Sequence, residues 1–331
     1  MTESSSNAPA RRDAPGRIGV VIQGPDPATA VNLIVEAEQA GIGAVWMTTG
    51  GIQADALTLF AAAAMRTERI VMGSAIIPTW PRNPVFVVQQ VEALEGIAPG
   101  RLRLGIGPST AAAMRPFGVD FRSPLTQLRE YLIVLRSLLH QGSVDFEGKL
   151  VRARARITQP VNTPVLASAL QEGAFRLCGE VADGALSWVC PWPYIRDHAW
   201  PALRAGAESA GREAPPLIMH VPICVTTDLS QVREATQRQV GMYARFQFYQ
   251  DMFRRAGHAD AADGLSQSLI DDLVIYGTEA EVAERLAERA AQGFGEVMAL
   301  PLLTGDDRAG STRAAYAAVG AAARLAGSAA G

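Results

Sequence analysis

The sequence predicts a (β/α)8 barrel, because strand, loop and helix patterns alternate along most of its 331 residues. The clearest unit is the apolar run 70–77, which meets three prolines and then the helical pattern 85–94. A buried apolar run, a turn and a helix in this order are typical of a parallel sheet. A doubly wound open sheet is the alternative that the same pattern allows.

Eight such units follow one another along the chain. The expected strands are 18–23, 44–48, 70–75, 101–107, 165–169, 185–189, 217–225 and 296–300, and the expected helices are 27–40, 54–65, 85–94, 125–139, 173–181, 194–210, 231–253 and 278–291. Asp26 precedes Pro27, a good N-cap followed by proline at the first helical position. Left-handed C-cap residues are expected after four helices, at Gly41, Gly142, Gly211 and Gly293.

Two segments exceed a minimal barrel, and we expect them as insertions after the fourth and seventh strands. Residues 147–156 alternate apolar and basic side chains, which favours a small exposed hairpin. Residues 226–275 contain five of the chain's aromatics, namely Tyr243, Phe246, Phe248, Tyr249 and Phe253. Aromatics at helical spacing usually form core, but after a barrel strand they also suit a lid or a pocket wall. A last Ala-rich helix is expected over 312–326.

Composition narrows the class of protein. The chain is 48% hydrophobic and 19% charged with a net charge of −3, which gives no reason to expect nucleic acid or an anionic membrane as a partner. Residues 1–16 lack the apolar core of a secretory signal, so we expect a disordered tail there and one domain over 17–331. No apolar run is long enough to span a bilayer. Three widely spaced cysteines suit reduced thiols in a cytoplasm.

The usual catalytic constellations are weak. None of the four histidines has metal-ligand spacing with a Cys, Asp or Glu partner, and neither a CxxC pair nor a GxSxG elbow occurs, so we expect no metal. His220 lies inside an apolar strand, where a buried structural histidine is the simpler interpretation. A barrel with few acids, bases and nucleophiles suggests that a cofactor carries the reaction.

Two loops could hold such a cofactor. Residues 105–110 end a strand with small residues, which either let a flat ligand approach the backbone or merely make a tight turn. Residues 167–174 run from a strand into a helix, whose free N–H groups would form an anion site or a plain helix start. No GxGxxG motif follows a strand, which argues against a dinucleotide fold.

Several segments together resemble the bacterial luciferase-like family of flavin and deazaflavin enzymes, over about residues 17–305. The resemblance is carried by Gly73-Ser74-Ala75-Ile76-Ile77-Pro78, Arg82-Asn83-Pro84, Gly100-Arg101-Leu102-Arg103-Leu104-Gly105-Ile106-Gly107-Pro108-Ser109, Glu180-Val181-Ala182-Asp183-Gly184-Ala185 and Gly277-Thr278 with Val282-Ala283-Glu284-Arg285-Leu286. The GxGPS turn and the ADG before a strand are most similar to the branch that uses coenzyme F420, a deazaflavin.

The resemblance implies a barrel with the cofactor ring at its C-terminal mouth and a cis peptide bond at Ala75–Ile76. It implies ring contacts from Gln23, Thr48, Thr49, Ser74, Ala75, Ile76, Gly107, Pro108 and Ser109. It also implies a phosphate site after the fifth strand, at Ala169, Gln171, Glu172, Gly173 and Ala174. Members that resemble this chain commonly form homodimers, and Trp46, Trp80, Trp188, Trp192 and Trp200 are candidate interface side chains, with pocket or core as the alternative.

The chain departs from the dehydrogenases of this family. They carry an Asp-His pair after strand two, where this sequence has Thr48-Thr49-Gly50, and a Glu after strand four, where Thr110 is the nearest match. Without a general base, reduction of an acceptor is favoured over oxidation of an alcohol. We expect Thr48, Thr49 or Ser109 to polarise that acceptor.

The expected small-molecule substrate is apolar and conjugated, because its candidate walls are Trp80, Trp188, Tyr243, Phe246 and Tyr249. Arg82 and Arg245 are the exceptions that could instead bind an anion. Two alternatives to an F420-dependent oxidoreductase stay open. One is an FMN-dependent monooxygenase that uses molecular oxygen, and the other is a cofactor-binding barrel without catalysis.

Overall fold

The computed structural model describes residues 18–50, 52–261 and 264–328. The tail expected at 1–16 lies outside these residues. Eight parallel strands close into a barrel, because β10 pairs with both β12 and β9 at the two ends of the sheet order. The predicted (β/α)8 barrel is therefore confirmed. Around it the strands are β1 (Ile18–Val21), β2 (Ala44–Met47), β3 (Val71–Ser74), β5 (Leu102–Gly107), β8 (Val165–Ser168), β9 (Gly184–Leu186), β10 (Leu217–Val225) and β12 (Gly295–Pro301).

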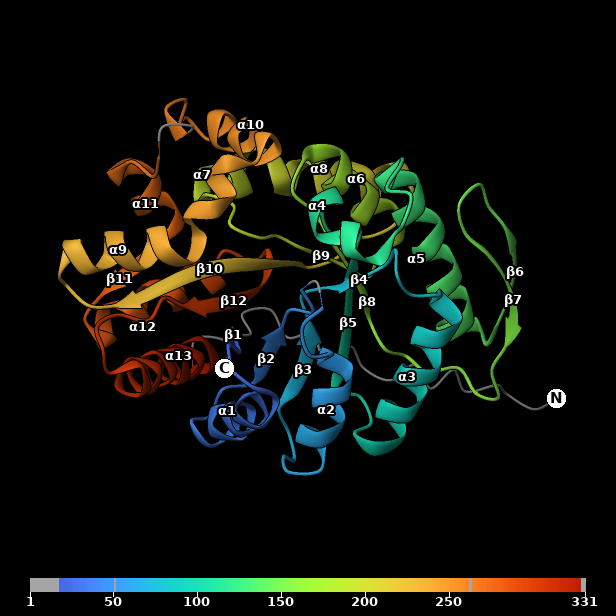
Figure 1. The fold of residues 1–331 in the computed structure, drawn as a ribbon, viewed down its shortest axis with the longest axis horizontal. Helices are drawn as coiled ribbons and strands as arrows, with labels where there is room; N and C mark the ends of the chain where they lie inside the picture. The colour runs from blue at the N-terminus through green and yellow to red at the C-terminus, as the bar shows by residue number, and fades with distance from the viewer. Residues whose placement is uncertain (1–17, 51, 262–263, 329–331) are drawn as a thin grey trace.

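Helices surround the barrel, and further helices lie in the loops that join its strands (Figure 1). They are α1 (Pro27–Gln39), α2 (Ala56–Ala64), α3 (Pro84–Ile97), α4 (Ala111–Met114), α5 (Pro124–Gln141), α6 (Glu172–Val181), α7 (Trp192–Tyr194), α8 (Trp200–Ser209), α9 (Leu229–Val240), α10 (Gln247–Arg255), α11 (Gln267–Leu273), α12 (Glu279–Ala290) and α13 (Arg308–Ser328). Asp26 caps α1 as predicted, since its carboxylate accepts the N–H of Thr29 at 2.9 Å. The expected last helix is α13.

The interior of the barrel is identified by side chains that meet across it. Glu296 on β12 accepts the indole N–H of Trp46 on β2 at 2.9 Å and pairs with Arg103 on β5. These strands are not neighbours, so the three side chains point inward. Trp46 is fully buried there, and a side chain on Gly73 would place its Cβ 2.3 Å from the indole ring. Trp46 is thus a core residue, and the expectation that it lies at an interface is wrong.

Both insertions are present. The hairpin consists of β6 (Ser143–Glu147) and β7 (Arg152–Arg156), paired antiparallel, so it begins four residues earlier than predicted. After β10 come α9, α10 and α11, which Figure 1 shows grouped beside the outer end of β10. A short strand, β11 (Ile275–Gly277), adds to the C-terminal part of β10 and was not predicted.

The single helix expected over 231–253 is wrong. The structure has α9, then a 3-10 turn over Gly241–Arg245, then α10. The break falls at Gly241, because glycine is a weak helix former. It is also crowded, since an added Cβ would lie 2.5 Å from Gln237. The turn changes the direction of the chain and brings the aromatics of this segment together.

Candidate active site

The third strand is interrupted where the resemblance places the cofactor ring. Gly73 on β3 pairs with Arg103, and Ile77 on β4 (Ile77–Pro78) pairs with Ile106, so one extra residue bulges from this edge. The peptide bond Ala75–Ile76 within the bulge is cis, which confirms the prediction.

The hydroxyl of Ser74 hydrogen-bonds to β5 where the backbone pairing between the strands is interrupted by this bulge. Ser74 is fully buried, donates to the carbonyl of Gly105 at 2.8 Å and accepts the Gly105 N–H at 2.9 Å. Without this hydroxyl the Gly105 N–H would be unpaired inside the protein, whereas the Gly105 carbonyl also accepts the N–H of Ile77 in the β4–β5 ladder. Ser74 therefore supports the bulge from behind, and its hydroxyl is already engaged on both sides.

The two glycines in the last part of β5, Gly105 and Gly107, are required by the protein's own packing. A Cβ on Gly105 would lie 1.9 Å from the Ser74 carbonyl oxygen, and one on Gly107 would lie 2.1 Å from Oγ of Ser168. The loop continues through Pro108 and Ser109, which are half-buried, and Ser109 has φ of 60°. The small residues thus allow the bulge and neighbouring strands to approach β5.

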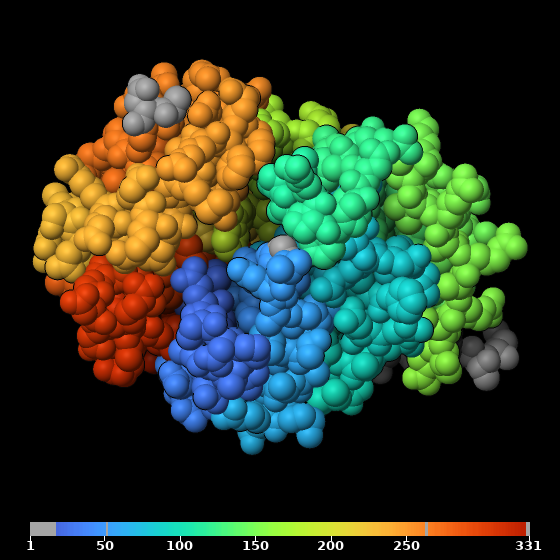
Figure 2. All heavy atoms as spheres, in the orientation of Figure 1, coloured from blue at the N-terminus to red at the C-terminus, as the bar shows by residue number. Residues whose placement is uncertain are grey.

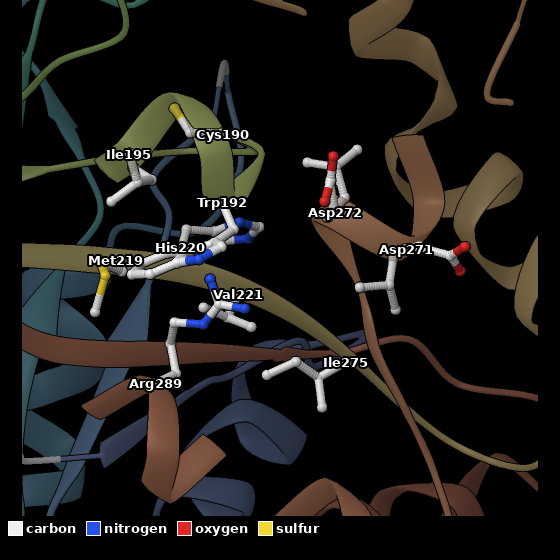
Figure 3. Close-up of a pocket in the computed structure, with 12 residues that line it drawn as sticks. Cys190, Trp192, Ile195, Met219, His220, Val221, Asp271, Asp272, Ile275 and Arg289 are labelled. Carbon is white, nitrogen blue, oxygen red and sulfur yellow. The ribbon is translucent and has the colours of Figure 1, made fainter. Parts of the chain in front are cut away.

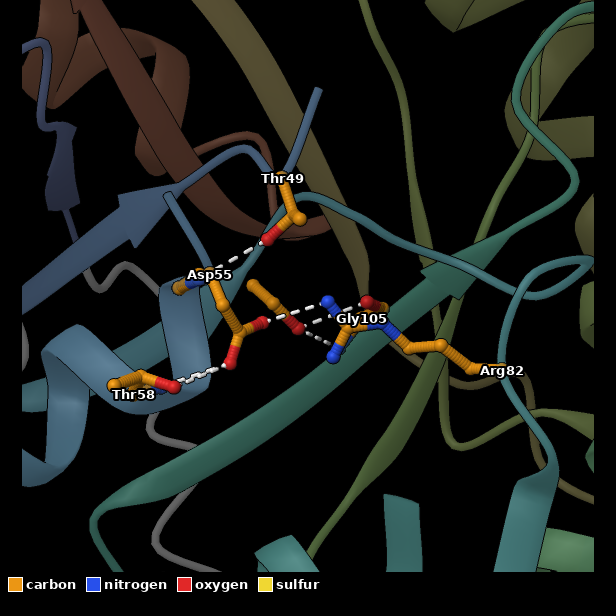
Figure 4. Close-up of polar contacts among 7 residues, drawn as sticks. Thr49, Asp55, Thr58, Arg82 and Gly105 are labelled. Atoms are coloured by element: carbon orange, nitrogen blue, oxygen red, sulfur yellow. Dashed lines mark hydrogen bonds and ion pairs between the residues drawn. The ribbon is translucent and has the colours of Figure 1, made fainter. Parts of the chain in front are cut away.

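The loop after β2 contacts the same bulge. Thr49 is 6% exposed, its N–H donates to the carbonyl of Ile76 at 3.1 Å, and its hydroxyl accepts the N–H of Ala56 at 3.1 Å (Figure 4). The hydroxyl proton of Thr49 remains available for donation. Thr48 and Gln23 are exposed at the ends of β2 and β1. These residues surround the bulge at the carboxyl ends of adjacent strands.

Arg82 is paired beside this loop. Its guanidinium bonds the carboxylate of Asp55 at 2.8 Å, and Asp55 also caps α2 through the N–H of Thr58 at 3.1 Å (Figure 4). Burial opposes ionisation of Asp55, but the Thr58 hydroxyl and Arg82 outweigh it and hold its pKa below the usual value. Asp55 is therefore an engaged carboxylate and not a ready general base.

The start of α6 carries the predicted phosphate segment. The first N–H groups of a helix have no intrahelical partner, and Gly173 among them is exposed. An added Cβ on Gly173 would meet only Leu125, at 3.7 Å. Ala169 is buried and Ala174 half-buried beside it. There is room here for an anionic group against the helix N-terminus.

Neighbouring elements hold the side chains of this segment. Gln171 donates to the carbonyl of Phe248 on α10 at 2.6 Å. The carboxylate of Glu172 meets Arg255 on α10 at 2.6 Å and His198 at 3.0 Å. Arg255 offsets the negative charge that Glu172 would present to an anion. The insertion after β10 is thus tied to the start of α6.

The predicted wall residues separate into two groups. Trp188 donates to the hydroxyl of Tyr243 at 2.8 Å, and Tyr243 lies 4.9 Å from Tyr249 and 6.5 Å from Phe246, centroid to centroid. Tyr249 is only 6% exposed, so it forms the buried base of this group. Trp80 lies apart, in contact with Phe121 at 5.3 Å. Figure 2 shows the surface hollowed between the orange α9–α10 segment and the teal segment around α4.

A small cavity lies beside β10. Its volume is about 20 Å³, and Trp192, His220 and Arg289 are among the residues that line it (Figure 3). Arg289 lies 3.8 Å from the centroid of the Trp192 ring, and burial lowers the pKa of its guanidinium to about 10. The cavity has the size of one water molecule, and none of the predicted cofactor or wall residues lines it.

Within the described ranges, no three His, Cys, Asp or Glu side chains gather as metal ligands would. No described helix is long and apolar enough to cross a membrane.

Comparison with known proteins identifies the family. The model of the luciferase-like monooxygenase family matches residues 4–296. A 5,10-methylenetetrahydromethanopterin reductase of Methanolobus tindarius is 26% identical over 206 residues, which cover 62% of this chain and 63% of that protein, less than two thirds of its length. An F420-dependent glucose-6-phosphate dehydrogenase of Nakamurella multipartita is 28% identical over 231 residues, covering 64% and 68%.

A solved structure shows the same architecture. An F420-dependent secondary alcohol dehydrogenase in complex with an F420–acetone adduct superposes with a TM-score of 0.77 at 20% identity, over 93% of this chain and 99% of that chain. At this identity the likeness shows the fold alone. Because the family model covers most of the sequence, the chain belongs to the luciferase-like monooxygenase family.

Proposed function

We propose that this protein is a coenzyme F420-dependent oxidoreductase that reduces an organic acceptor. The proposal rests on one observation: the bulge after β3, the loop after β5 and the start of α6 lie together at one end of the barrel. The relatives named above support the cofactor, since one is named as an F420-dependent dehydrogenase and the other as a reductase.

The residues present fit such a cofactor. The exposed Gly173 gives a phosphate access to free N–H groups, and we place the ring against the half-buried Ile76 of the bulge. When bound, the deazaflavin exchanges a hydride with an organic molecule. Thr48, Thr49 and Ser109 lie on the loops beside the bulge, and we assign them the polarisation of the acceptor.

Reduction is favoured because the described residues after β2 offer no free base. Thr48, Thr49 and Gly50 stand there, and the nearby Asp55 is engaged by Arg82 and by the start of α2. General base catalysis typically supplies about 10²–10⁴-fold, so alcohol oxidation should be slow. Reduction of a conjugated acceptor needs only a proton from water or a hydroxyl.

A paired assay tests this function. Reduced F420 with cyclohex-2-enone or a nitroaromatic should be consumed, and oxidised F420 with glucose 6-phosphate or isopropanol should stay oxidised. Fast reduction of F420 by either alcohol would contradict the proposed direction. The aromatic group around Trp188 and Tyr243 supports an apolar acceptor, whereas Arg245 is exposed and Arg82 is paired.

An FMN-dependent monooxygenase is the second candidate, because the matching family is described as monooxygenases. Deazaflavin has carbon where flavin has the nitrogen next to the oxygen-activating carbon, so it reacts poorly with oxygen. Bound cofactor that absorbs near 450 nm and consumes oxygen during turnover would favour the FMN enzyme.

We also propose a homodimer and a cytoplasmic location. Phe86, in the first turn of α3, is 67% exposed, and an exposed aromatic side chain of this size suits contact with a second copy. Light scattering should give twice the chain mass, and Phe86→Glu should give the monomer. Three buried free thiols, at Cys178, Cys190 and Cys224, suit a reducing compartment.

A further inference from the structure

The imidazole of His220 on β10 has one engaged nitrogen and one without a partner. The side chain is 2% exposed, and Nδ1 accepts the N–H of Val189 at 3.2 Å. A neutral imidazole whose Nδ1 accepts carries its proton on Nε2. Among the described residues, this Nε2 has no hydrogen-bond partner. A buried donor without an acceptor is unusual in a native protein and points to a missing group.

His220 points into the barrel. Its neighbour Ile218 pairs with Glu296, which points inward, and His220 pairs with Met298 two residues further on. Paired residues of parallel strands share a face, and side chains alternate along each strand. Burial lowers the pKa of His220 to about 3, so it is a neutral donor at physiological pH.

His220 is level with the bulge, on the opposite wall. Following paired residues from strand to strand around the barrel, Ser74 leads through β2, β1 and β12 to Ile223, which lies in β10. In the other direction it leads through β5, β8 and β9 to Pro215, just before β10. These positions are eight residues apart, which is the stagger of this type of barrel. Their midpoint, Met219, is therefore the residue of β10 at the height of Ser74. His220, the next residue, is one step closer to the mouth.

Trp188 covers the imidazole. The two ring centroids lie 3.9 Å apart with planes inclined at 35°, and the Trp188 indole N–H is held by the hydroxyl of Tyr243 at 2.8 Å. Trp188 is half-buried and Tyr243 belongs to the insertion after β10. The donor of His220 thus lies directly beneath a predicted wall residue of the substrate site.

We propose that His220 donates a hydrogen bond from Nε2 to the carbonyl oxygen of the electron-accepting substrate. The proposal rests on the proposed function and names the chemistry of its substrate, a ketone or enone. Hydride addition to an enone carbon, with oxidation of the reduced deazaflavin, moves an electron pair onto the oxygen. The neutral N–H stabilises that oxygen, a proton from water completes the reduction, and His220 keeps its own proton. Trp188 must move aside for the oxygen to reach Nε2.

Two substitutions separate this role from a structural one. Asn at position 220 places an acceptor near Nδ1 and keeps the Val189 bond but cannot reach the position of Nε2. Gln places an N–H near Nε2 but gives up the Nδ1 acceptor. We expect His220→Asn to fold and to lose about 10²-fold in kcat/KM with cyclohex-2-enone. We expect His220→Gln to retain most activity. The reverse order would overturn the proposal.

A binding measurement gives a readout without turnover. Selective ¹⁵N labelling of the four histidines, assigned with His220→Asn, reports the Nε2–H resonance. We expect no change with oxidised F420 alone and a downfield shift when cyclohex-2-enone is added to that complex. A shift with F420 alone would move the acceptor to the cofactor ring, and no shift in either complex would also refute the assignment. If wild type binds the enone with this shift but does not reduce it, the proposed reaction fails and the His220 contact stands.

Discussion

Replacement of Ser74 by alanine tests whether the bulge depends on one hydroxyl. Ser74→Ala leaves the N–H of Gly105 without a partner at a site that is 0% exposed, while the Gly105 carbonyl keeps its ladder bond from Ile77. One unsatisfied buried group costs about 1–3 kcal/mol, so the free energy of unfolding should fall by about that amount. Urea denaturation followed by tryptophan fluorescence measures this loss, with an unchanged m-value.

Ser187→Ala is the matched control for this change. Ser187 is 1% exposed, and its hydroxyl accepts one backbone hydrogen bond, from the N–H of His220 at 3.1 Å. Its removal should cost a similar amount, about 1–3 kcal/mol, because it also leaves one buried N–H unpaired. F420 affinity should fall in Ser74→Ala and stay near wild type in Ser187→Ala. A stability loss below about 1 kcal/mol in Ser74→Ala, with unchanged affinity, would refute the role given to Ser74.

Three further predictions follow from the geometry. Gly173→Ala should leave F420 affinity unchanged, because the added Cβ would meet only Leu125 at 3.7 Å. Gly173→Asp should weaken F420 binding at least tenfold, because its carboxylate repels a phosphate. Equal affinities of the two variants in fluorescence titrations would show that the phosphate does not bind at Gly173. Glu296→Gln should destabilise the protein by about 3 kcal/mol in urea, because it removes the buried negative charge that pairs with Arg103, and an unchanged midpoint would contradict this. Burial lowers the pKa of His220 from 6.5 to about 3, so between these two values only the unfolded state binds a proton at this imidazole. The stability of the wild type should therefore fall more steeply towards pH 3 than that of His220→Asn. Parallel curves for the two proteins would argue against a neutral buried imidazole.

The barrel was predictable because its signals are local. Each apolar run and each following helix carries its own pattern, and Asp26 before Pro27 already marks the start of α1. The break at Gly241 and the short strand β11 were not predictable in the same way. The break rests on a single glycine within an otherwise helical pattern, and β11 is three residues long and exists because β10 extends beyond the barrel.

The site was predictable where the family motif is contiguous. The motif at residues 73–78 predicted the bulge, but contacts between side chains of strands that face each other across the barrel could not be predicted from the sequence. Interface and core stayed open for Trp46, because its partner Glu296 is 250 residues away in the sequence. His220 was taken as structural, which agrees with its bond to Val189. That Nε2 of His220 has no partner depends on the position of every group around the imidazole, which the sequence does not specify.

Separate titrations of F420 and FMN into the purified protein test the central claim most directly. The bulge, the loop after β5 and the start of α6 should together bind F420, with quenching of its fluorescence and at least about tenfold higher affinity than for FMN, a difference of about 1.4 kcal/mol. Gly173→Asp should abolish most of that difference. Tight binding of FMN together with no quenching of F420 would contradict the account.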